Sequence, residues 1–301
     1  MRYINNESLD YMLSTKEHWI RKEYEDYVTG NVVKELPLKP GTKSYKIGII
    51  IPNYNYSEWL DKSIGSILKQ NYSNYEIIFI DDMSTDDSYE KAKRLIGDKG
   101  KTIKLKQRRL NGGARNEGYL YLSDDVDYVW YVDSDDWISQ NALYKINANL
   151  QGEPDVLFVG LGTDIQGINA SYYIPNYKDK YEAIKGWSGS SGKVIKKDLA
   201  VKCLYPEGTL KEDRTQHYKV CIEMDSYRCL KEVIYVWNRN NTKSVTTERN
   251  TKWKADTIRN WADSVEMYET YKGKDIKIDE LLLARVENCK NEVMNNEDSQ
   301  Q

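Results

Sequence analysis

The sequence predicts an α/β fold in which a mostly parallel central sheet is flanked by helices, with helical extensions at both ends of the chain. Between residues 46 and 159, short β-branched and aromatic runs alternate with amphipathic segments of roughly 10–15 residues, as in βαβ units. Polar clusters follow the first, second and fourth of these runs. Because ligands bind outside the carboxyl ends of parallel strands, these clusters indicate one common site.

Each element is predicted from its local pattern. Apolar residues recur at helical spacing over residues 6–29, and the prolines and glycine of Leu36–Gly41 then break the pattern, as in a linker. Ser84 or Thr85 can cap one of the helices that follow. The predicted strands are 47–51, 76–80, 102–106, 128–132 and 155–159, and the predicted helices are 57–69, 85–96, 112–122 and 139–150.

Beyond residue 160 the pattern becomes irregular. Gly160–Tyr177 and Gly186–Gly192 are rich in Gly, Ser and Tyr and are predicted to be long surface loops. Helical spacing returns before a polar tail, Asn295–Gln301. The two helices expected there are 251–272 and 277–295, and the expected domains are an N-terminal helical extension and linker (1–44), a central domain (45–248) and C-terminal helices with the tail (249–301).

The terminal helices carry Trp19, Trp253 and Trp261 on otherwise charged segments. Three roles are open for these helices: packing against the central domain, self-association into a homo-oligomer, and contact with the periphery of a membrane. The absence of a clean basic face argues against the membrane role.

Composition narrows the class of protein. The net charge of −3 over 301 residues provides no global positive field for nucleic acid. No apolar run approaches the roughly 20 residues of a membrane span, and the N-terminus lacks the apolar core of a signal peptide. The four cysteines form no CxxC pair and there are only two histidines, which argues against zinc. We therefore expect a reduced, soluble, cytoplasmic protein.

A cluster of carboxylates is the most informative feature of the chain. Asp133, Asp135 and Asp136 directly follow the apolar run Tyr128–Val132. Unpaired charge at a strand end is costly unless a cation or donor groups meet it. Mg²⁺ and Mn²⁺ prefer carboxylate oxygens and are often completed by substrate phosphates. The cluster therefore indicates a metal–diphosphate site, and the alternative is a solvated turn that caps the next helix.

Five motifs in order resemble those of family 2 glycosyltransferases, which have the Rossmann-like GT-A fold. They are Ile49–Asn55, Phe79–Asp86, Asn111–Asn116, Tyr131–Asp136 and Glu212–Asp213, and the resemblance spans roughly residues 46–245. It implies an inverting, metal-dependent enzyme that uses a nucleotide-sugar donor, with a UDP-sugar as the commonest case. The implied cofactor is a divalent metal, Mn²⁺ or Mg²⁺.

The resemblance also implies which residues bind the nucleotide. Tyr54 is placed to stack on the base, the backbone at Pro52 to read its edge, and Asp82 to bind base or ribose. Asp82 could instead cap the helix 85–96, and Arg115 could instead pair with the aspartate cluster for structural reasons. The full nucleotide set is Pro52, Asn53, Tyr54, Asn55, Asp82, Arg115, Asp133 and Asp135.

Metal and catalytic roles follow from the same resemblance. Asp135 and Asp136 are the implied metal ligands, with Asp136 the more direct one. Asp213 is the implied general base that deprotonates the acceptor, and Glu212 is the alternative base. His217 is expected to be a helix-surface or core residue rather than a metal ligand.

Other candidates are assigned by position. Arg239, Lys243 and Ser244 lie in a loop after an aromatic-rich strand and are candidate diphosphate contacts. Trp187 could stack on a sugar, or it could anchor its loop to the core.

The acceptor is less constrained than the donor. A glycan, a lipid-linked glycan or a polymer is the first expectation, and a protein or a modified DNA base is the alternative. Lysines between 178 and 202 keep nucleic acid open as a partner: Lys178, Lys180, Lys185, Lys193, Lys196, Lys197 and Lys202. A non-catalytic nucleotide-sugar-binding module is the third hypothesis, against which the intact aspartates argue.

Overall fold

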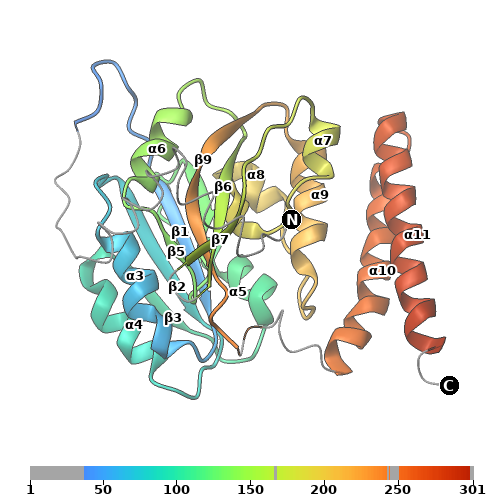
Figure 1. Ribbon diagram of the computed structural model, residues 1–301, viewed down its shortest axis with the longest axis horizontal. Coiled ribbons are helices and arrows are strands. Elements are labelled where there is room, and N and C mark those ends of the chain that lie inside the picture. Colours follow the sequence, from blue (N-terminus) through green and yellow to red (C-terminus); the bar gives the residue numbers. More distant parts are fainter. Residues whose placement is uncertain (1–36, 166–167, 243, 245–250, 299–301) are drawn as a thin grey trace.

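The computed structural model describes residues 37–165, 168–242, 244 and 251–298 (Figure 1). The helix predicted over 6–29, with Trp19, lies outside these residues, and so does Lys243. Within them, no helix is both long enough and apolar enough to cross a membrane.

A central sheet organises the described part of the chain. Its order is β3-β2-β1-β4-β8-β6-β9-β5, with β7 paired to β6 outside this path. The strands are β1 Ile47–Asn53, β2 Tyr75–Asp81, β3 Gly100–Lys104, β4 Tyr128–Tyr131, β5 Trp137–Ile138, β6 Val156–Ile165, β7 Ile168–Tyr173, β8 Lys193–Lys196 and β9 Tyr227–Asn238.

The first four strands form the expected parallel half of the sheet. β1 pairs in parallel with both β2 and β4, and β3 pairs in parallel with β2. The register places Asn53 opposite Asp81 and Ile50 opposite Tyr131. The polar residues that follow these strands therefore emerge at one edge of the sheet.

The second half of the sheet is mixed rather than parallel. β8 runs antiparallel to both β4 and β6, while β9 runs parallel to β6 with register shifts. The segment Gly160–Tyr177, predicted to be a surface loop, instead contains the end of β6 and the antiparallel strand β7. Its Gly, Ser and Tyr content hid the strand pattern because such residues also favour turns.

Helices cover both faces of the sheet, and all seven residues of β1 are accordingly buried. Ile49 and Ile51 belong to the apolar cluster under α3 (Leu60–Leu68), α4 (Ser88–Ile96) and α6 (Ala142–Asn149). Ile50 belongs to the opposite cluster. That cluster includes residues of α5 (Leu110–Gly118), α7 (Lys180–Ile184), α8 (Lys197–Lys202) and α9 (Glu212–Glu223).

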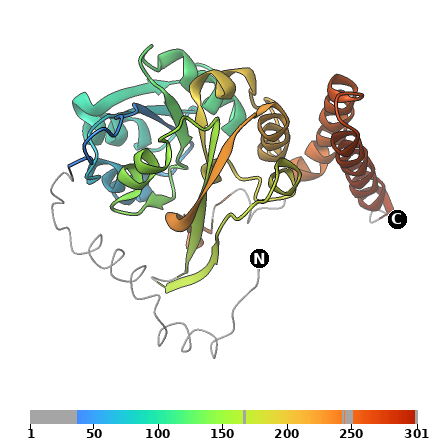
Figure 2. The same ribbon diagram turned by 90° about the horizontal axis from the view of Figure 1, so that it is seen from above.

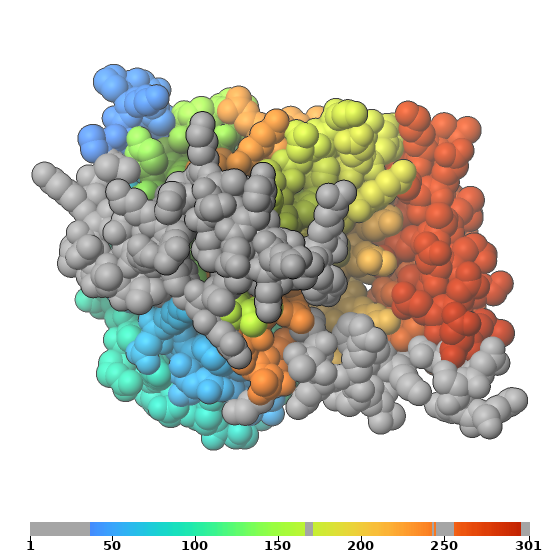
Figure 3. Space-filling model, in the orientation of Figure 1, coloured from blue at the N-terminus to red at the C-terminus, as the bar shows by residue number. Residues whose placement is uncertain are grey.

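The C-terminal helices form a hairpin beside α9. α10 (Thr251–Tyr271) and α11 (Ile276–Asp298) lie side by side at one end of the molecule, as two views agree (Figures 1 and 2). A small cluster that includes Met267 and Leu282 packs against Tyr218 of α9 and Tyr181 of α7. In the space-filling view the red side chains of the hairpin meet the yellow and orange ones of this region (Figure 3).

Element boundaries shift by a few residues from those predicted. The helix expected over 85–96 begins at Ser88, and neither Ser84 nor Thr85 is its N-cap. β3 lies two residues earlier than expected, and α11 runs to Asp298, into the predicted polar tail.

Candidate active site

A pocket of about 440 Å³ opens where the parallel strands end. Its walls come from β1, from the loop after β4, from the loop before β8, from the start of α9 and from α10 and α11. Ten of the residues singled out in the sequence line it: Pro52, Tyr54, Arg115, Asp133, Asp135, Asp136, Trp187, Glu212, Asp213 and Ser244.

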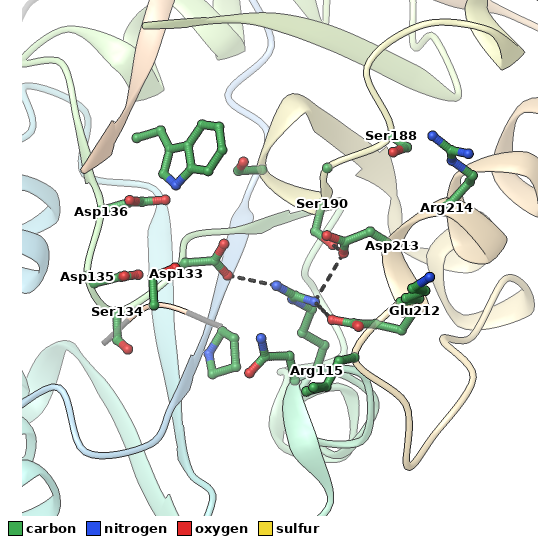
Figure 4. A pocket seen from close by; sticks show the side chains of 18 of the residues that line it. Arg115, Asp133, Ser134, Asp135, Asp136, Ser188, Ser190, Glu212, Asp213 and Arg214 are labelled. Carbon is green, nitrogen blue, oxygen red and sulfur yellow. Dashed lines mark hydrogen bonds and ion pairs between the residues drawn. The ribbon is translucent and has the colours of Figure 1, made fainter. Parts of the chain in front are cut away.

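Arg115 connects the two halves of the pocket. One Nη donates to Asp133 Oδ1 (2.7 Å), and the other donates to Glu212 Oε1 (2.9 Å) and to Asp213 Oδ1 (3.3 Å) (Figure 4). The side chain is buried. Burial opposes its charge, but Asp133 and Asp213 together with other neighbours raise the pKa of Arg115. From the sequence, two roles were open for Arg115: nucleotide binding and pairing with the aspartate cluster. In the structure Arg115 pairs with the cluster and also lines the pocket.

Asp135 is a buried carboxylate, and a side chain donates to one of its two oxygens. Asn241 Nδ2 donates to Asp135 Oδ2 at 2.7 Å, whereas no side chain of the described residues donates to Oδ1. Burial first, and repulsion by Asp133 second, raise the pKa of Asp135 to about 7. A cation at this position would relieve both penalties.

Asp136 has a different environment from Asp135. The Tyr235 hydroxyl donates to Asp136 Oδ2, and the backbone N–H of Asn238 donates to Oδ1 at 2.8 Å. Burial, followed by repulsion from Asp135, raises the pKa of Asp136. Both oxygens thus accept a hydrogen bond from β9, and the role of Asp136 as the most direct metal ligand stays a prediction.

Asp133 and Asp135 are the two residues of the aspartate cluster that could hold a divalent cation. In the cluster, Asp133 Oδ2 and Asp135 Oδ1 are carboxylate oxygens to which no side chain of the described residues donates. In that part of the chain, no group of three His, Cys, Asp or Glu residues is arranged to hold a metal. Mg²⁺-type sites commonly use one or two carboxylates and are completed by water and substrate phosphates.

Glu212 and Asp213 begin α9 and differ in access. The Glu212 side chain is 4% exposed, and burial followed by the nearby Asp213 raises its pKa to about 7. The Asp213 side chain is 40% exposed. Its Oδ1 accepts from both Arg115 and the Ser190 hydroxyl, which leaves Oδ2 facing no donor in the described residues.

A buried lysine supports the loop that carries Ser190. Lys193 Nζ donates to the carbonyls of Ser188 (2.9 Å) and Gly189 (2.8 Å). Burial lowers its pKa to about 8. Lys193 is therefore unavailable to the predicted basic patch, and Lys202, also in that set, pairs with Glu223.

Tyr54 lines the pocket, and a cation covers its ring. The Arg108 guanidinium carbon lies 3.0 Å from the Tyr54 centroid, and Arg108 Nε is 3.0 Å from Asp82 Oδ2. Asp82 also accepts the backbone N–H groups of Arg109 (2.7 Å) and Leu110 (2.8 Å). Asp82 thus supports the start of α5, not the helix 85–96, and burial raises its pKa.

Two residues of the first motif are structural in this geometry. Asn53 is buried and donates to Asp81 and Ser84, and neither it nor Asn55 is among the residues that line the pocket. Asn55 has a φ of 58° and accepts the N–H of Thr85 at 2.7 Å. Asparagine tolerates this left-handed conformation better than most residues. Both side chains shape the loop that presents Tyr54.

The remaining candidates divide between the pocket and its surroundings. Trp187 lines the pocket and also packs on Trp237 and Tyr173, so both of its predicted roles are compatible with the structure. Arg239 stacks 4.5 Å from Trp237 and is not among the lining residues. His217 is fully buried and contacts the carbonyls of α7, which confirms a core role.

Several residues of the site were not predicted from the sequence. Ser190, Tyr235 and Asn241 each contact one of the aspartates, and Arg108 and Arg214 line the pocket. The Ser- and Gly-rich segment 186–192 was predicted only to be a surface loop, because the identity of its contact residue depends on tertiary structure.

Comparisons with known proteins identify the family of the chain. Residues 48–197 match the model of glycosyl transferase family 2. The chain belongs to this family. It is 29% identical over 230 residues to the glycosyltransferase GlyA of Streptococcus pneumoniae, covering 68% of this chain and 32% of GlyA. It is 30% identical over 115 residues to the UDP-Glc:α-D-GlcNAc-diphosphoundecaprenol β-1,3-glucosyltransferase WfgD of Escherichia coli, covering 38% and 45%.

A solved structure shows the same fold. Residues 1–349 of TarS from S. aureus, in complex with UDP-GlcNAc, superpose with a TM-score of 0.65 at 19% identity, covering 80% of this chain and 72% of that one. The fold of this family 2 member is therefore GT-A, as the motifs predicted. The chain spans about a third of the length of GlyA and under half that of WfgD.

Proposed function

We propose that this family 2 member is an inverting glycosyltransferase that moves a sugar from a nucleotide-diphosphate donor to an acceptor hydroxyl, with Asp213 as general base. The observation that carries the proposal is the joint geometry of the pocket. A half-exposed carboxylate with a free oxygen, Asp213, lines the same cavity as Asp133 and Asp135, and Arg115 bridges the two groups.

The donor half of the pocket suits a nucleotide diphosphate. Pro52 and Tyr54 supply a flat wall at the end of β1, and Arg108 and Arg115 supply positive charge. TarS was solved with UDP-GlcNAc, and the name of WfgD specifies UDP-Glc as its donor. These names support a UDP-sugar as the donor here. A base that stacks on the Tyr54 face now covered by Arg108 requires that guanidinium to move.

Asp133 and Asp135 would hold a divalent cation, Mn²⁺ or Mg²⁺, through the oxygens to which no side chain of the described residues donates. Such a cation, when bound, neutralises charge that develops on the departing diphosphate. We assign Asp136 to the support of this loop rather than to direct ligation, because β9 engages both of its oxygens.

Asp213 is better placed than Glu212 to take the acceptor proton. Its Oδ1 is fixed by Arg115 and Ser190, so Oδ2 is oriented and accessible. Glu212 is buried and its Oε1 is held by Arg115. In the proposed step the acceptor oxygen bonds to the anomeric carbon, the bond from that carbon to the diphosphate breaks, and the acceptor proton passes to Asp213. A single displacement of this kind inverts the anomeric centre.

The acceptor is proposed to be a hydroxyl of a carbohydrate or lipid-linked glycan. The name of WfgD specifies a diphosphoundecaprenol-linked GlcNAc acceptor, which supports this class. The burial of Lys193 and the pairing of Lys202 with Glu223 weaken the nucleic-acid alternative, which rested on the lysines of this region.

Release of nucleotide diphosphate from a panel of UDP- and GDP-sugars tests the proposal. With a competent acceptor, or slowly with water, the wild type is expected to release UDP, and Asp213→Asn is expected to lower kcat by at least about 100-fold. Asp213→Asn should still bind UDP. The matched control is Asp225→Asn, an exposed aspartate beyond the other end of α9, which should retain full activity. Equal loss of UDP binding and turnover in Asp213→Asn would contradict the assignment.

A further inference from the structure

The C-terminal hairpin contacts the segment that carries the proposed base. Asp256 of α10 is buried, and its Oδ2 accepts the backbone N–H of Leu210 at 2.8 Å. Lys211 Nζ donates to Thr257 Oγ1 (3.2 Å) and forms an ion pair with Glu292 of α11 (3.1 Å). The two residues that directly precede Glu212 and Asp213 are thus held by side chains of α10 and α11.

A second contact holds α9 on the other side of the base. Arg285 of α11 is 3% exposed, and its Nη2 donates to Thr215 Oγ1 (2.8 Å) and to Asn260 Oδ1 (3.0 Å). Its guanidinium carbon also lies 4.9 Å from the centroid of the Tyr218 ring. Thr215 is two residues after Asp213, so the base lies between two points anchored by the hairpin.

Burial of the charged Arg285 side chain costs folding free energy, so stability alone does not explain its presence. The hydrogen bonds that it makes in the described residues go to neutral oxygens, and its Nε and Nη1 are buried without a hydrogen-bond partner there. A buried charge without a paired opposite charge usually destabilises a protein relative to an apolar residue of similar size. Its position beside the first turns of α9 indicates a role in the site.

The hairpin also reaches the pocket itself. Asn260 of α10 and Glu292 of α11 line the same cavity as Asp213. The hairpin lies on the α9 side of the molecule, whereas the Asp133–Asp136 loop forms the opposite wall of the pocket (Figures 1 and 4). The wall that it contributes is therefore on the side of the base.

We propose that the hairpin α10–α11 is part of the catalytic unit, and that Asp256 and Arg285 are positioning residues that fix the first turns of α9 and aim Asp213 into the pocket. This inference rests on the proposed function of Asp213. The N-cap of α9, Lys211, provides no side-chain cap of its own. The contacts at Leu210, Lys211 and Thr215 therefore hold the backbone of the first turn, while Arg115 and Ser190 hold its side chains. A displacement of about 1 Å at a reacting group can cost roughly 100-fold in rate.

The test compares two replacements of Asp256 in the full-length chain. Asp256→Ala removes the acceptor for the Leu210 N–H, whereas Asp256→Asn retains an acceptor oxygen. We expect Asp256→Ala to lower kcat for UDP release by roughly tenfold to 100-fold with an unchanged KM for the donor. Asp256→Asn should restore most of the rate. Asp279→Ala is the matched control, because Asp279 accepts the N–H of Gly273 (3.0 Å) at the hairpin turn.

A positioning role and a purely structural role give different results. Arg285→Met should maintain or raise the melting temperature while lowering kcat by at least tenfold. If Asp256→Ala and Asp279→Ala lower kcat equally, or if Arg285→Met keeps the wild-type kcat, the hairpin does not position the base and the proposal is overturned.

Hydrogen exchange separates this inference from the proposed function. In Asp256→Ala the amides of residues 210–216 should exchange at least tenfold faster than in the wild type, with those of β1 unchanged. Unchanged exchange at 210–216 overturns the inference whatever the activity. If the wild type releases no nucleotide but exchange still rises, the proposed function fails while the hairpin remains the element that holds α9.

Discussion

Removal of the Arg115 guanidinium is expected to destabilise the protein in a pH-dependent way. Arg115→Leu places an apolar side chain at this buried position and leaves Asp133, Glu212 and Asp213 without their shared cation. Asp133 and Asp213 are 35% and 40% exposed, so water screens much of their charge. Glu212 is 4% exposed and carries most of the penalty.

The size of the effect follows from that burial. Loss of one partner of a buried ion pair costs about 3–5 kcal/mol. The unfolding entropy of a chain of this length is about 0.6 kcal/mol per kelvin, so the melting temperature should fall by about 5–8 °C at pH 8.

The pH dependence has a definite sign. The pKa of Glu212 is already raised to about 7, and loss of Arg115 raises it further. The stability linked to Glu212 is therefore greatest below its ordinary pKa and is lost as the pH rises through the folded value. At pH 5.5 Glu212 is protonated in both proteins, so the melting temperatures should differ by less than at pH 8.

Differential scanning calorimetry at the two pH values is the assay. The control is Arg109→Leu, which also loses two ion pairs, but from partners that are 18% and 41% exposed. Surface pairs contribute about 0–1 kcal/mol each, so loss of two should lower the melting temperature of this control by at most about 3 °C. A decrease for Arg115→Leu that is no larger than the control, or that is equal at both pH values, would refute the assignment of a buried Arg115–Glu212 pair.

Two further outcomes follow from the aspartate loop. Because the pKa of Asp135 is raised to about 7, protons compete with a cation for this carboxylate below pH 7. The Mn²⁺-dependent affinity for UDP should therefore fall about tenfold per pH unit below pH 7. A flat profile in isothermal titration calorimetry between pH 5.5 and 8 would contradict this. Asp136→Asn should lower the melting temperature by about 2–5 °C, since the amide cannot reproduce both hydrogen bonds from β9. UDP binding by this variant should still depend on Mn²⁺. If the Mn²⁺ dependence of UDP binding is lost and the melting temperature is unchanged, Asp136 is a metal ligand.

Local pattern was sufficient to predict the first half of the fold. β1, β2 and β4 are short runs of β-branched or aromatic residues that are buried on both faces of the sheet. Such runs are typical of central parallel strands, so their composition alone predicts them. In the second half β9 reads as a mixed polar and apolar segment, and its pairing with β6 includes register shifts. Such irregular pairing depends on tertiary contacts that no single segment encodes.

The candidate site shows the same division. The sequence identified the carboxylates, since charged residues after a buried strand need an explanation, and the structure brings Asp133, Asp135 and Asp213 to one pocket. The sequence did not reveal that Asp136 is engaged by Tyr235 and Asn238, about 100 residues later. Nor did the sequence reveal that the oxygens of Asp82, which was assigned to the nucleotide, also accept the N–H groups at the start of α5. These differences depend on long-range hydrogen bonds.

Binding of UDP with and without Mn²⁺, measured by calorimetric melting of the wild type and of Asp135→Asn, tests the central claim most directly. UDP at 100 times its dissociation constant should add about 2.7 kcal/mol, or about 4 °C. We expect this shift for the wild type only when Mn²⁺ is present, and we expect it to be lost in Asp135→Asn. An equal UDP shift in both proteins, or no shift with UDP, GDP, CDP or dTDP under any condition, would contradict a nucleotide-sugar site organised by Asp133 and Asp135.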